Sequence, residues 1–158
     1  MDDLTRELIY QWRGRAKNLS TKGLEDDYIF FFIYYLCLDA WITNESGKSN
    51  EKEKKKWLIE NGGELKSAFI ENRFDKSDLV KLKTFSPILN MGPGHSGKVE
   101  LTDIENFRDV VNFIYQIRCN LFHGSKDPGS GRNKDIVSFA SSFLKKWIES
   151  AQTKDLIS

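Results

Sequence analysis

The sequence predicts an all-α protein, a small bundle of about five to six helices formed by one domain that spans residues 1–158. Three observations support this fold class. Apolar residues recur at helical spacing in several segments, glycine or proline separates most of these segments, and the sequence lacks the strand–helix alternation that a parallel sheet needs. A chain of 158 residues can also bury enough apolar surface to fold without a disulfide or a metal.

The first two helices are expected in the N-terminal third of the chain. Residues 4–19 form an amphipathic pattern that Lys22 and Gly23 end, and the next pattern is apolar at every position from 28 to 38. Asp39 interrupts this run well short of the roughly 20 apolar residues that a membrane span needs. We therefore expect a buried helix. Because a helix that is apolar all round needs cover on every side, we also expect a homodimer.

Three short helices are expected in the middle of the chain. Residues 50–57 hold four lysines and two glutamates, a charge pattern that is typical of a solvated helix and that we do not treat as a phosphate site. Gly62 and Gly63 separate this helix from a second short one. Residues 75–85 predict the third, which Pro87 closes.

A longer helix is expected to begin at Thr102, because Thr102 and Glu105 have the spacing of a capping box. Apolar residues keep helical spacing from 104 to 122, and Arg118 falls within their stripe. A guanidinium at a core-facing position needs a carboxylate, phosphate or carbonyl partner, since burying it alone costs several kcal/mol. Gly124 is well placed to end this helix.

The last helix is expected after the turn-rich segment 127–133, with Asn133 as its N-cap. Apolar residues from 136 to 148 repeat at helical spacing. We expect this helix to pack on the core through that stripe.

The motif R-C-N-L-F-H-G-S-K begins at Arg118 and places His123 after four intervening residues. This pattern, on a late helix of a small helical protein, resembles the HEPN domains, whose signature spaces arginine and histidine by four to six residues. The apolar segment 28–41 also resembles the long aromatic helix of that family, where Asn or Asp followed by Ala commonly lies near the end, as Asp39 does here. The family usually has Asn, Asp or His directly after the arginine, where this chain has Cys119.

The resemblance implies a metal-independent endoribonuclease without a cofactor, in which two copies of the motif face one cleft across a homodimer. Arg118 then holds the phosphate, His123 moves a proton near neutral pH, and the ribose 2′-hydroxyl is the nucleophile. Asn120 is a further candidate catalytic residue, Lys126 a candidate phosphate contact, and Asp39 a candidate site residue that orients Arg118 or Asn120. Such domains occur in prokaryotic toxin and phage-defence systems, so RNA is the implied substrate and an antitoxin a possible partner.

Two alternatives stay open. The first is a non-catalytic HEPN-like module that binds RNA or protein, with Arg118 and His123 only joining the helix to its neighbour. The second is nucleotide binding by the glycine-rich segment from Gly92 to Lys98, which satisfies G-x-G-x-x-G and most of G-x-x-x-x-G-K. A P-loop follows a buried parallel strand and leads directly into a helix, whereas the next helix here is expected only at Thr102.

Composition narrows the class of protein only in part. A formal net charge of +1 provides no general attraction to nucleic acid, so any RNA binding must come from a local patch. Cys37 and Cys119 lie in apolar helical stretches, and no signal-peptide pattern is evident at the N-terminus. We therefore expect two free thiols in a reducing cytoplasm, with no metal site, since His95 has no other ligand nearby in the sequence.

Overall fold

The computed structural model describes residues 3–21, 27–89, 97–122 and 131–157 of the chain. Within these ranges it contains seven helices and a two-stranded antiparallel sheet, which confirms the all-α class. The elements are α1 (Asp3–Thr21), α2 (Asp27–Ser46), α3 (Glu51–Glu60), α4 (Gly63–Ile70), α5 (Ser77–Lys83), β1 (Ile88–Leu89), β2 (Lys98–Val99), α6 (Phe107–Phe122) and α7 (Gly131–Ile157). The seven helices of the described residues exceed the stated total of five to six, although each of them, including the short α3, α4 and α5, lies in a segment for which the sequence predicts a helix.

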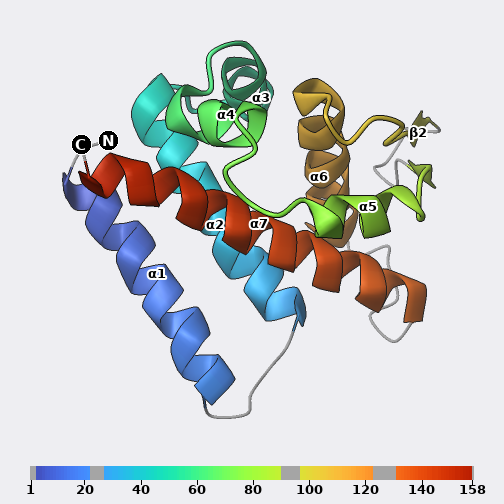
Figure 1. Ribbon diagram of the computed structural model, residues 1–158, viewed down its shortest axis with the longest axis horizontal. Coiled ribbons are helices and arrows are strands. Elements are labelled where there is room, and N and C mark those ends of the chain that lie inside the picture. Colours follow the sequence, from blue (N-terminus) through green and yellow to red (C-terminus); the bar gives the residue numbers. More distant parts are fainter. Residues whose placement is uncertain (1–2, 22–26, 90–96, 123–130, 158) are drawn as a thin grey trace.

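Helices α2 and α7 form the centre of the molecule (Figure 1). Helix α7 crosses the whole structure and packs against α2, α4 and α5, while α1 packs against α2. Helix α6 stands at the other side of the bundle from α1 and contacts α3, α4 and the small sheet. No helix among the described residues combines the length and the hydropathy that crossing a membrane requires.

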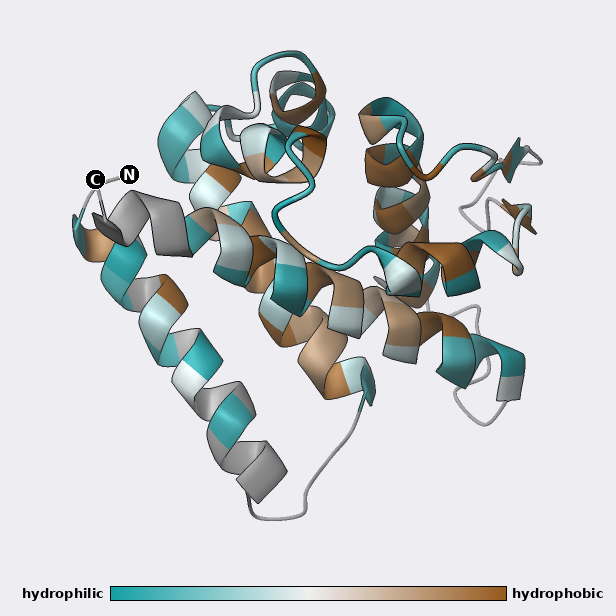
Figure 2. Cartoon of the chain, in the orientation of Figure 1, coloured by the Kyte–Doolittle hydropathy of each residue, from teal (hydrophilic) through white to brown (hydrophobic). Residues whose placement is uncertain are grey.

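Helix α2 supplies many of the buried side chains of the described core. In Figure 2 hydrophobic residues are concentrated on α2, α6 and α7. The sequence predicts a fully buried α2, but Ile29 and Leu36 are each 44% exposed. They are seven residues apart and therefore lie on one face of the helix. One chain thus leaves a stripe of α2 uncovered, and the homodimer that this stripe suggests stays a prediction.

Aromatic side chains join α4, α6 and α7 around Trp147. Ring centroids are 5.1 Å apart for Phe69 and Phe107, 5.9 Å for Phe107 and Trp147, and 5.4 Å for Phe143 and Trp147. The indole Nε1 of Trp147 donates a 2.7 Å hydrogen bond to the carbonyl oxygen of Leu65. The indole nitrogen therefore enters the core with its donor satisfied, as buried polar groups require.

The capping box predicted at Thr102 is wrong, because α6 begins only after Asn106. The side chain of Asn106 accepts a hydrogen bond from the backbone N–H of Asp109 at 3.2 Å, which is the N-cap interaction that starts the helix. Glu105 does not reach back to Thr102. Its carboxylate instead pairs with Lys76 at a distance of 2.9 Å.

The predicted cap of the last helix is also wrong, since α7 begins at Gly131 and Asn133 lies inside it. The N-cap of α3 is formed by Asn50, whose side chain accepts hydrogen bonds from the backbone N–H groups of Lys52 at 2.8 Å and Glu53 at 3.3 Å. Asn50 and Asn106 thus cap the helices that follow them, whereas Asn133 does not, so an asparagine near a predicted helix start does not by itself locate the first turn.

Replacing Trp147 tests the packing of α7 on α4 and α6. We expect Trp147→Phe to lower the free energy of unfolding by about 2–4 kcal/mol, because it leaves a cavity and removes the hydrogen bond to the Leu65 carbonyl. Val80→Ala, at a position of α5 that is 52% exposed, should change it by less than about 0.5 kcal/mol. Urea denaturation followed by circular dichroism measures both. Equal stability of the two variants would contradict the described core.

Candidate functional site

The motif residues of α6 are described only in part. Arg118, Cys119 and Asn120 lie in the last two turns of the described helix. His123 and Lys126 lie outside the described residues, so their expected roles stay predictions.

Arg118 lies between two tyrosine rings. Its guanidinium carbon Cζ is 5.7 Å from the ring centroid of Tyr35 on α2 and 5.9 Å from that of Tyr115, one turn earlier on α6. Contacts of this kind are cation–π interactions. Burial by itself lowers the pKa of Arg118, but Tyr35, Cys119 and Glu51 nearby raise it above its ordinary value. The guanidinium is therefore held as a cation at the junction of α2 and α6.

The two tyrosines stay protonated near neutral pH. Burial raises the pKa of Tyr35 far above its ordinary value, and burial together with Cys119 raises that of Tyr115. A phenol in this state can donate a hydrogen bond but cannot act as a base. The rings therefore hold the cation in place, and they do not supply the proton acceptor that an RNA-cleaving site needs.

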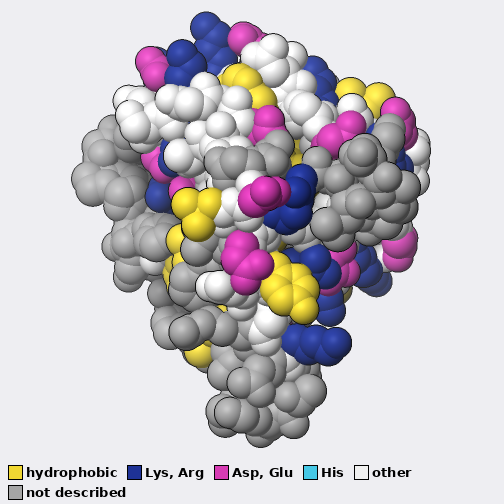
Figure 3. Space-filling model, turned by 90° about the vertical axis from the view of Figure 1, so that its left-hand side faces the viewer, with side chains coloured by type: hydrophobic (Ala, Val, Ile, Leu, Met, Phe, Trp, Pro, Cys, Tyr) yellow, Lys and Arg dark blue, Asp and Glu magenta, His cyan; other side chains and the backbone are white. Residues whose placement is uncertain are grey.

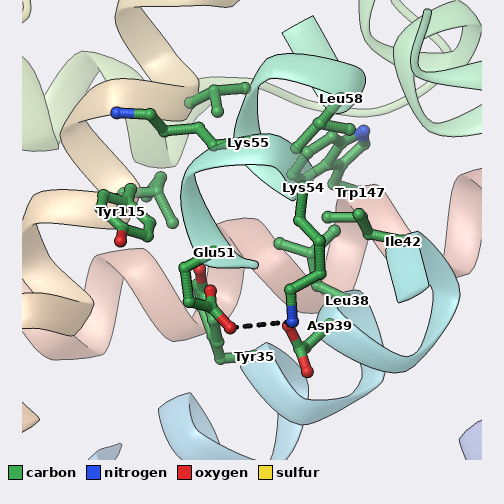
Figure 4. A pocket seen from close by; sticks show the side chains of 12 residues that line it. Tyr35, Leu38, Asp39, Ile42, Glu51, Lys54, Lys55, Leu58, Tyr115 and Trp147 are labelled. Atoms are coloured by element: carbon green, nitrogen blue, oxygen red, sulfur yellow. Dashed lines mark hydrogen bonds and ion pairs between the residues drawn. The ribbon is translucent and has the colours of Figure 1, made fainter. Parts of the chain in front are cut away.

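Asp39 contacts a lysine of α3. Its Oδ1 lies 2.7 Å from the Nζ of Lys54, and Oε1 of Glu51 lies 2.8 Å from the same nitrogen (Figure 4). Burial by itself lowers the pKa of Lys54, but these two carboxylates raise it above its ordinary value. The expectation that Asp39 orients Arg118 or Asn120 is replaced by this ion pair, which joins α2 to α3.

Lys55 is a site residue that the sequence analysis missed. Figure 4 shows that Lys54 reaches between Glu51 and Asp39, whereas Lys55 extends the other way, toward α6. Its Nζ lies 4.7 Å from the ring centroid of Tyr115. Burial lowers the pKa of Lys55. Consecutive residues of a helix point about 100° apart, so among the three consecutive lysines 54–56 only tertiary contacts decide which one faces the neighbouring helix.

We refer to Tyr35, Lys55, Tyr115 and Arg118 as the Arg118 cluster. Next to it, a small cavity of about 30 Å³ lies where α2, α3, α6 and α7 meet, and its lining includes the side chains of Tyr35, Lys55 and Tyr115. This volume has room for about one water molecule. The cavity therefore cannot enclose a ligand, and a ligand of the Arg118 cluster must bind from the surface.

Asn120 is buried, with only 2% of its surface exposed. Its Oδ1 accepts a hydrogen bond from Nε2 of Gln116 at 2.8 Å, and its Nδ2 donates one to the backbone carbonyl of Leu89 at 2.8 Å. Both ends of the amide are thus engaged inside the fold, where they join α6 to β1. This geometry assigns Asn120 to packing rather than to direct contact with a substrate.

The glycine-rich segment connects two antiparallel strands. Residues 90–96 lie outside the described residues, but Leu89 of β1 pairs with Lys98 of β2, and Ile88 pairs with Val99. A P-loop instead follows a parallel strand and runs directly into a helix. The next helix here is α6, which begins at Phe107. This arrangement does not support nucleotide binding from Gly92 to Lys98.

A second hollow, of about 790 Å³, lies between α1, α2 and α7. Its lining carries both signs of charge. The basic residues are Arg13, Lys17 and Lys145, and the acidic residues are Asp27 and Glu149. Arg13 and Glu149 pair with each other at 3.2 Å. Because the charges are mixed and partly neutralised, the lining indicates no particular class of ligand.

The described surface shows the same mixture of charge. On the face in Figure 3, basic and acidic side chains are interspersed, with apolar side chains scattered among them, in agreement with a net charge of +1. Among the described residues, no three His, Cys, Asp or Glu side chains gather as a metal site would require. A polyanion would therefore have to be recognised by a local group of cations such as the Arg118 cluster.

No protein-family model matches this chain, and no curated protein or solved structure matches it either. The class of protein that fold and site define is a small helical protein with a cation cluster, lined by tyrosines, where α2, α3 and α6 meet.

Replacing Asn120 tests whether its amide is structural. We expect Asn120→Ala to lower the free energy of unfolding by about 1–3 kcal/mol, since it leaves the Leu89 carbonyl and the Gln116 amide without this partner. Asn112→Ala, at a half-exposed position of the same helix, serves as the control and should cost less. Thermal and urea unfolding measure the difference. A fully stable Asn120→Ala protein would show that the amide is not needed to hold β1.

The two cysteines should differ in reactivity. Burial raises the pKa of Cys37 to about 12, so at pH 8 only about one molecule in 10⁴ carries the Cys37 thiolate. Cys119 is half-buried beside Arg118. We expect Ellman's reagent to modify one thiol of the native protein at pH 8 and the second only after unfolding. The fast phase should vanish in Cys119→Ser, and its survival there would contradict the burial of Cys37.

Proposed function

We propose that this protein is a metal-independent endoribonuclease of the HEPN type, which works in the cytoplasm as a homodimer. The setting of Arg118 is the observation that carries the proposal. Arg118 lies on α6 with its guanidinium carbon 5.7 Å from the ring of Tyr35 on α2, so the two segments that resemble the HEPN family meet at this residue. No metal is required, because the nucleophile is part of the substrate.

In the proposed reaction, the guanidinium of Arg118 binds two oxygens of the scissile phosphate and stabilises the charge that develops on phosphorus. His123 takes the proton of the ribose 2′-hydroxyl, whose oxygen then bonds to phosphorus while the bond from phosphorus to the 5′-oxygen breaks. A protonated histidine returns a proton to that 5′-oxygen. The products are a 2′,3′-cyclic phosphate and a 5′-hydroxyl.

Two observations bear on the homodimer. Residues five apart on one straight helix lie about 140° around its axis, so a second copy of the motif helps to bring a histidine and an arginine to one phosphate. The exposed stripe of α2 contains Ile29 and Leu36, and Leu36 adjoins Tyr35 of the Arg118 cluster in the sequence. A second chain that covers this stripe would pack on the turn of α2 that also carries Tyr35 of the Arg118 cluster. An antitoxin or another regulatory protein fits the toxin or phage-defence role that the HEPN resemblance implies.

Cys119 favours one alternative, a HEPN-like module that binds RNA without cutting it. Directly after Arg118 the family usually has a polar Asn, Asp or His, whereas here a thiol stands beside the guanidinium. A thiol is a weak hydrogen-bond donor and a poor substitute for an amide or an imidazole. In this alternative the protein binds RNA but does not cleave it.

RNA cleavage in EDTA tests the proposal. We expect the protein to cut single-stranded RNA, to leave a 2′,3′-cyclic phosphate and to spare DNA of the same sequence, because DNA lacks the 2′-hydroxyl. His123→Ala should lose about 10² to 10⁴ in rate. Arg118→Lys should also fail, because it keeps the charge but loses the planar fork that matches a phosphate. Gel electrophoresis of end-labelled RNA and phosphate mapping of the product ends measure these outcomes.

Arg108→Lys is the matched control, since Arg108 is an exposed arginine on the same helix. It should cut at the wild-type rate. Absence of metal-independent cleavage by the wild-type protein, or equal rates for Arg118→Lys and Arg108→Lys, would leave the non-catalytic module as the better description.

A further inference from the structure

Two cations from different helices converge on one tyrosine ring. The Nζ of Lys55 on α3 lies 4.7 Å from the ring centroid of Tyr115, and Cζ of Arg118 on α6 lies 5.9 Å from the same centroid. The sequence places these residues far apart, so the fold alone brings them together. Like charges repel each other, and this convergence therefore costs free energy unless an anion lies near both.

Two carboxylates near this point pair with another lysine, and one of them, Glu51, also helps to raise the pKa of Arg118. Asp39 and Glu51 both lie within 2.8 Å of the Nζ of Lys54. Within the described parts of the chain, Lys55 forms no ion pair of its own, and its contact is the face of Tyr115. Lys54 takes both of these carboxylates, so Lys55 adds a positive charge that no ion pair among the described residues offsets. Figure 4 shows Lys55 and Tyr115 on one side of this region and Asp39 with Lys54 on the other.

Lys55 is also partly desolvated. Burial lowers its pKa, which is the expected response of an ammonium group that has lost water without gaining a carboxylate. Its neighbours Lys52 and Lys56 on the same helix are exposed and keep their hydration. The cost of holding Lys55 against α6 is offset when an anion binds, because the Coulomb attraction is stronger at a site with less water.

We propose that Lys55 and Arg118, held in position by Tyr115, form a binding site for the phosphate backbone of single-stranded RNA. The proposal deepens the RNA-directed function above and rests on it for the identity of the ligand. Arg118 binds one phosphate through its planar fork, and Lys55 contacts the adjacent phosphate as a point charge. Tyr115 is a positioning residue, since its ring contacts both cations. The proposed binding site extends from Arg118 on α6 to Lys55 on α3.

Binding is measured separately from cleavage. The probe is a fluorescein-labelled 12-nucleotide RNA of mixed sequence in which every ribose carries a 2′-O-methyl group, so attack by the 2′-oxygen is blocked. Fluorescence anisotropy is recorded between 50 and 200 mM salt. We expect Lys55→Ala to weaken binding about tenfold, as loss of a charged hydrogen bond does. The slope of log affinity against log salt should fall by about 0.7, because one phosphate contact is lost.

Lys56→Ala is the matched control, because it removes the same charge from the next position of the same helix, where the side chain is exposed. It should change affinity less than twofold. Lys55→Arg should retain binding, since it keeps the cation against Tyr115, and it guards against a Lys55→Ala variant that fails to fold. Equal affinities for Lys55→Ala and Lys56→Ala, loss of binding in Lys55→Arg, or failure of the wild-type protein to bind would each overturn the inference.

The failure of this inference and that of the proposed nuclease activity are distinguishable. If methylated RNA binds through Lys55 but unmodified RNA is not cut, the phosphate site stands and the nuclease does not. If unmodified RNA is cut and Lys55→Ala binds as Lys56→Ala does, the nuclease stands and the phosphate site is overturned.

Discussion

The burial of α2 is the constraint on which the rest of the fold depends. Its side chains are apolar almost without interruption, and several, such as Phe31, Cys37 and Trp41, are fully buried or nearly so. Burying one large apolar side chain stabilises the fold by about 1.5–3 kcal/mol. Helices α1 and α7 both pack on α2, and α7 in turn holds α4 and α5. These neighbours leave Ile29 and Leu36 of α2 partly exposed, so a further chain that covers this stripe would add apolar contact there.

Charged groups at the edge of this core are held in position by carboxylates or aromatic rings of neighbouring residues. Lys54 is almost buried, and two carboxylates lie beside its ammonium group. Arg118 lies against two aromatic faces, which tolerate a cation better than an aliphatic surface does. Lys55 contacts the ring of Tyr115, and burial lowers its pKa. Among these three described cations, the charge of Lys55 is therefore the least stabilised by its surroundings. That difference is the physical basis for assigning it to a ligand rather than to the stability of the fold.

The proposed site separates binding from chemistry. In the proposal, phosphate binding depends on Arg118 and Lys55, which are held by rings and helices of the described core. The proposed proton transfer depends on His123, which follows the described end of α6 in the sequence. Asn120 belongs to neither, because its amide holds α6 to β1. Under this proposal, loss of cleavage would leave RNA binding intact, so the nuclease and the non-catalytic binding module would share the same phosphate contacts.

The sequence by itself determined the helical class and most of the helix positions, and it singled out Arg118 as a candidate site residue. These depend on local pattern, since apolar spacing and glycine or proline breaks act within a few residues. The start of α6 at Asn106 instead of Thr102, and the inclusion of Asn133 within α7, were not predictable in this way, because competing caps differ by only about 1 kcal/mol. Tertiary structure alone decided three further features. These are the ion pair of Asp39 with Lys54, the burial of Asn120, and the fact that Lys55 rather than a neighbouring lysine contacts α6. Each depends on which side chain of another helix comes within reach, and a one-residue step around a helix axis changes that answer completely.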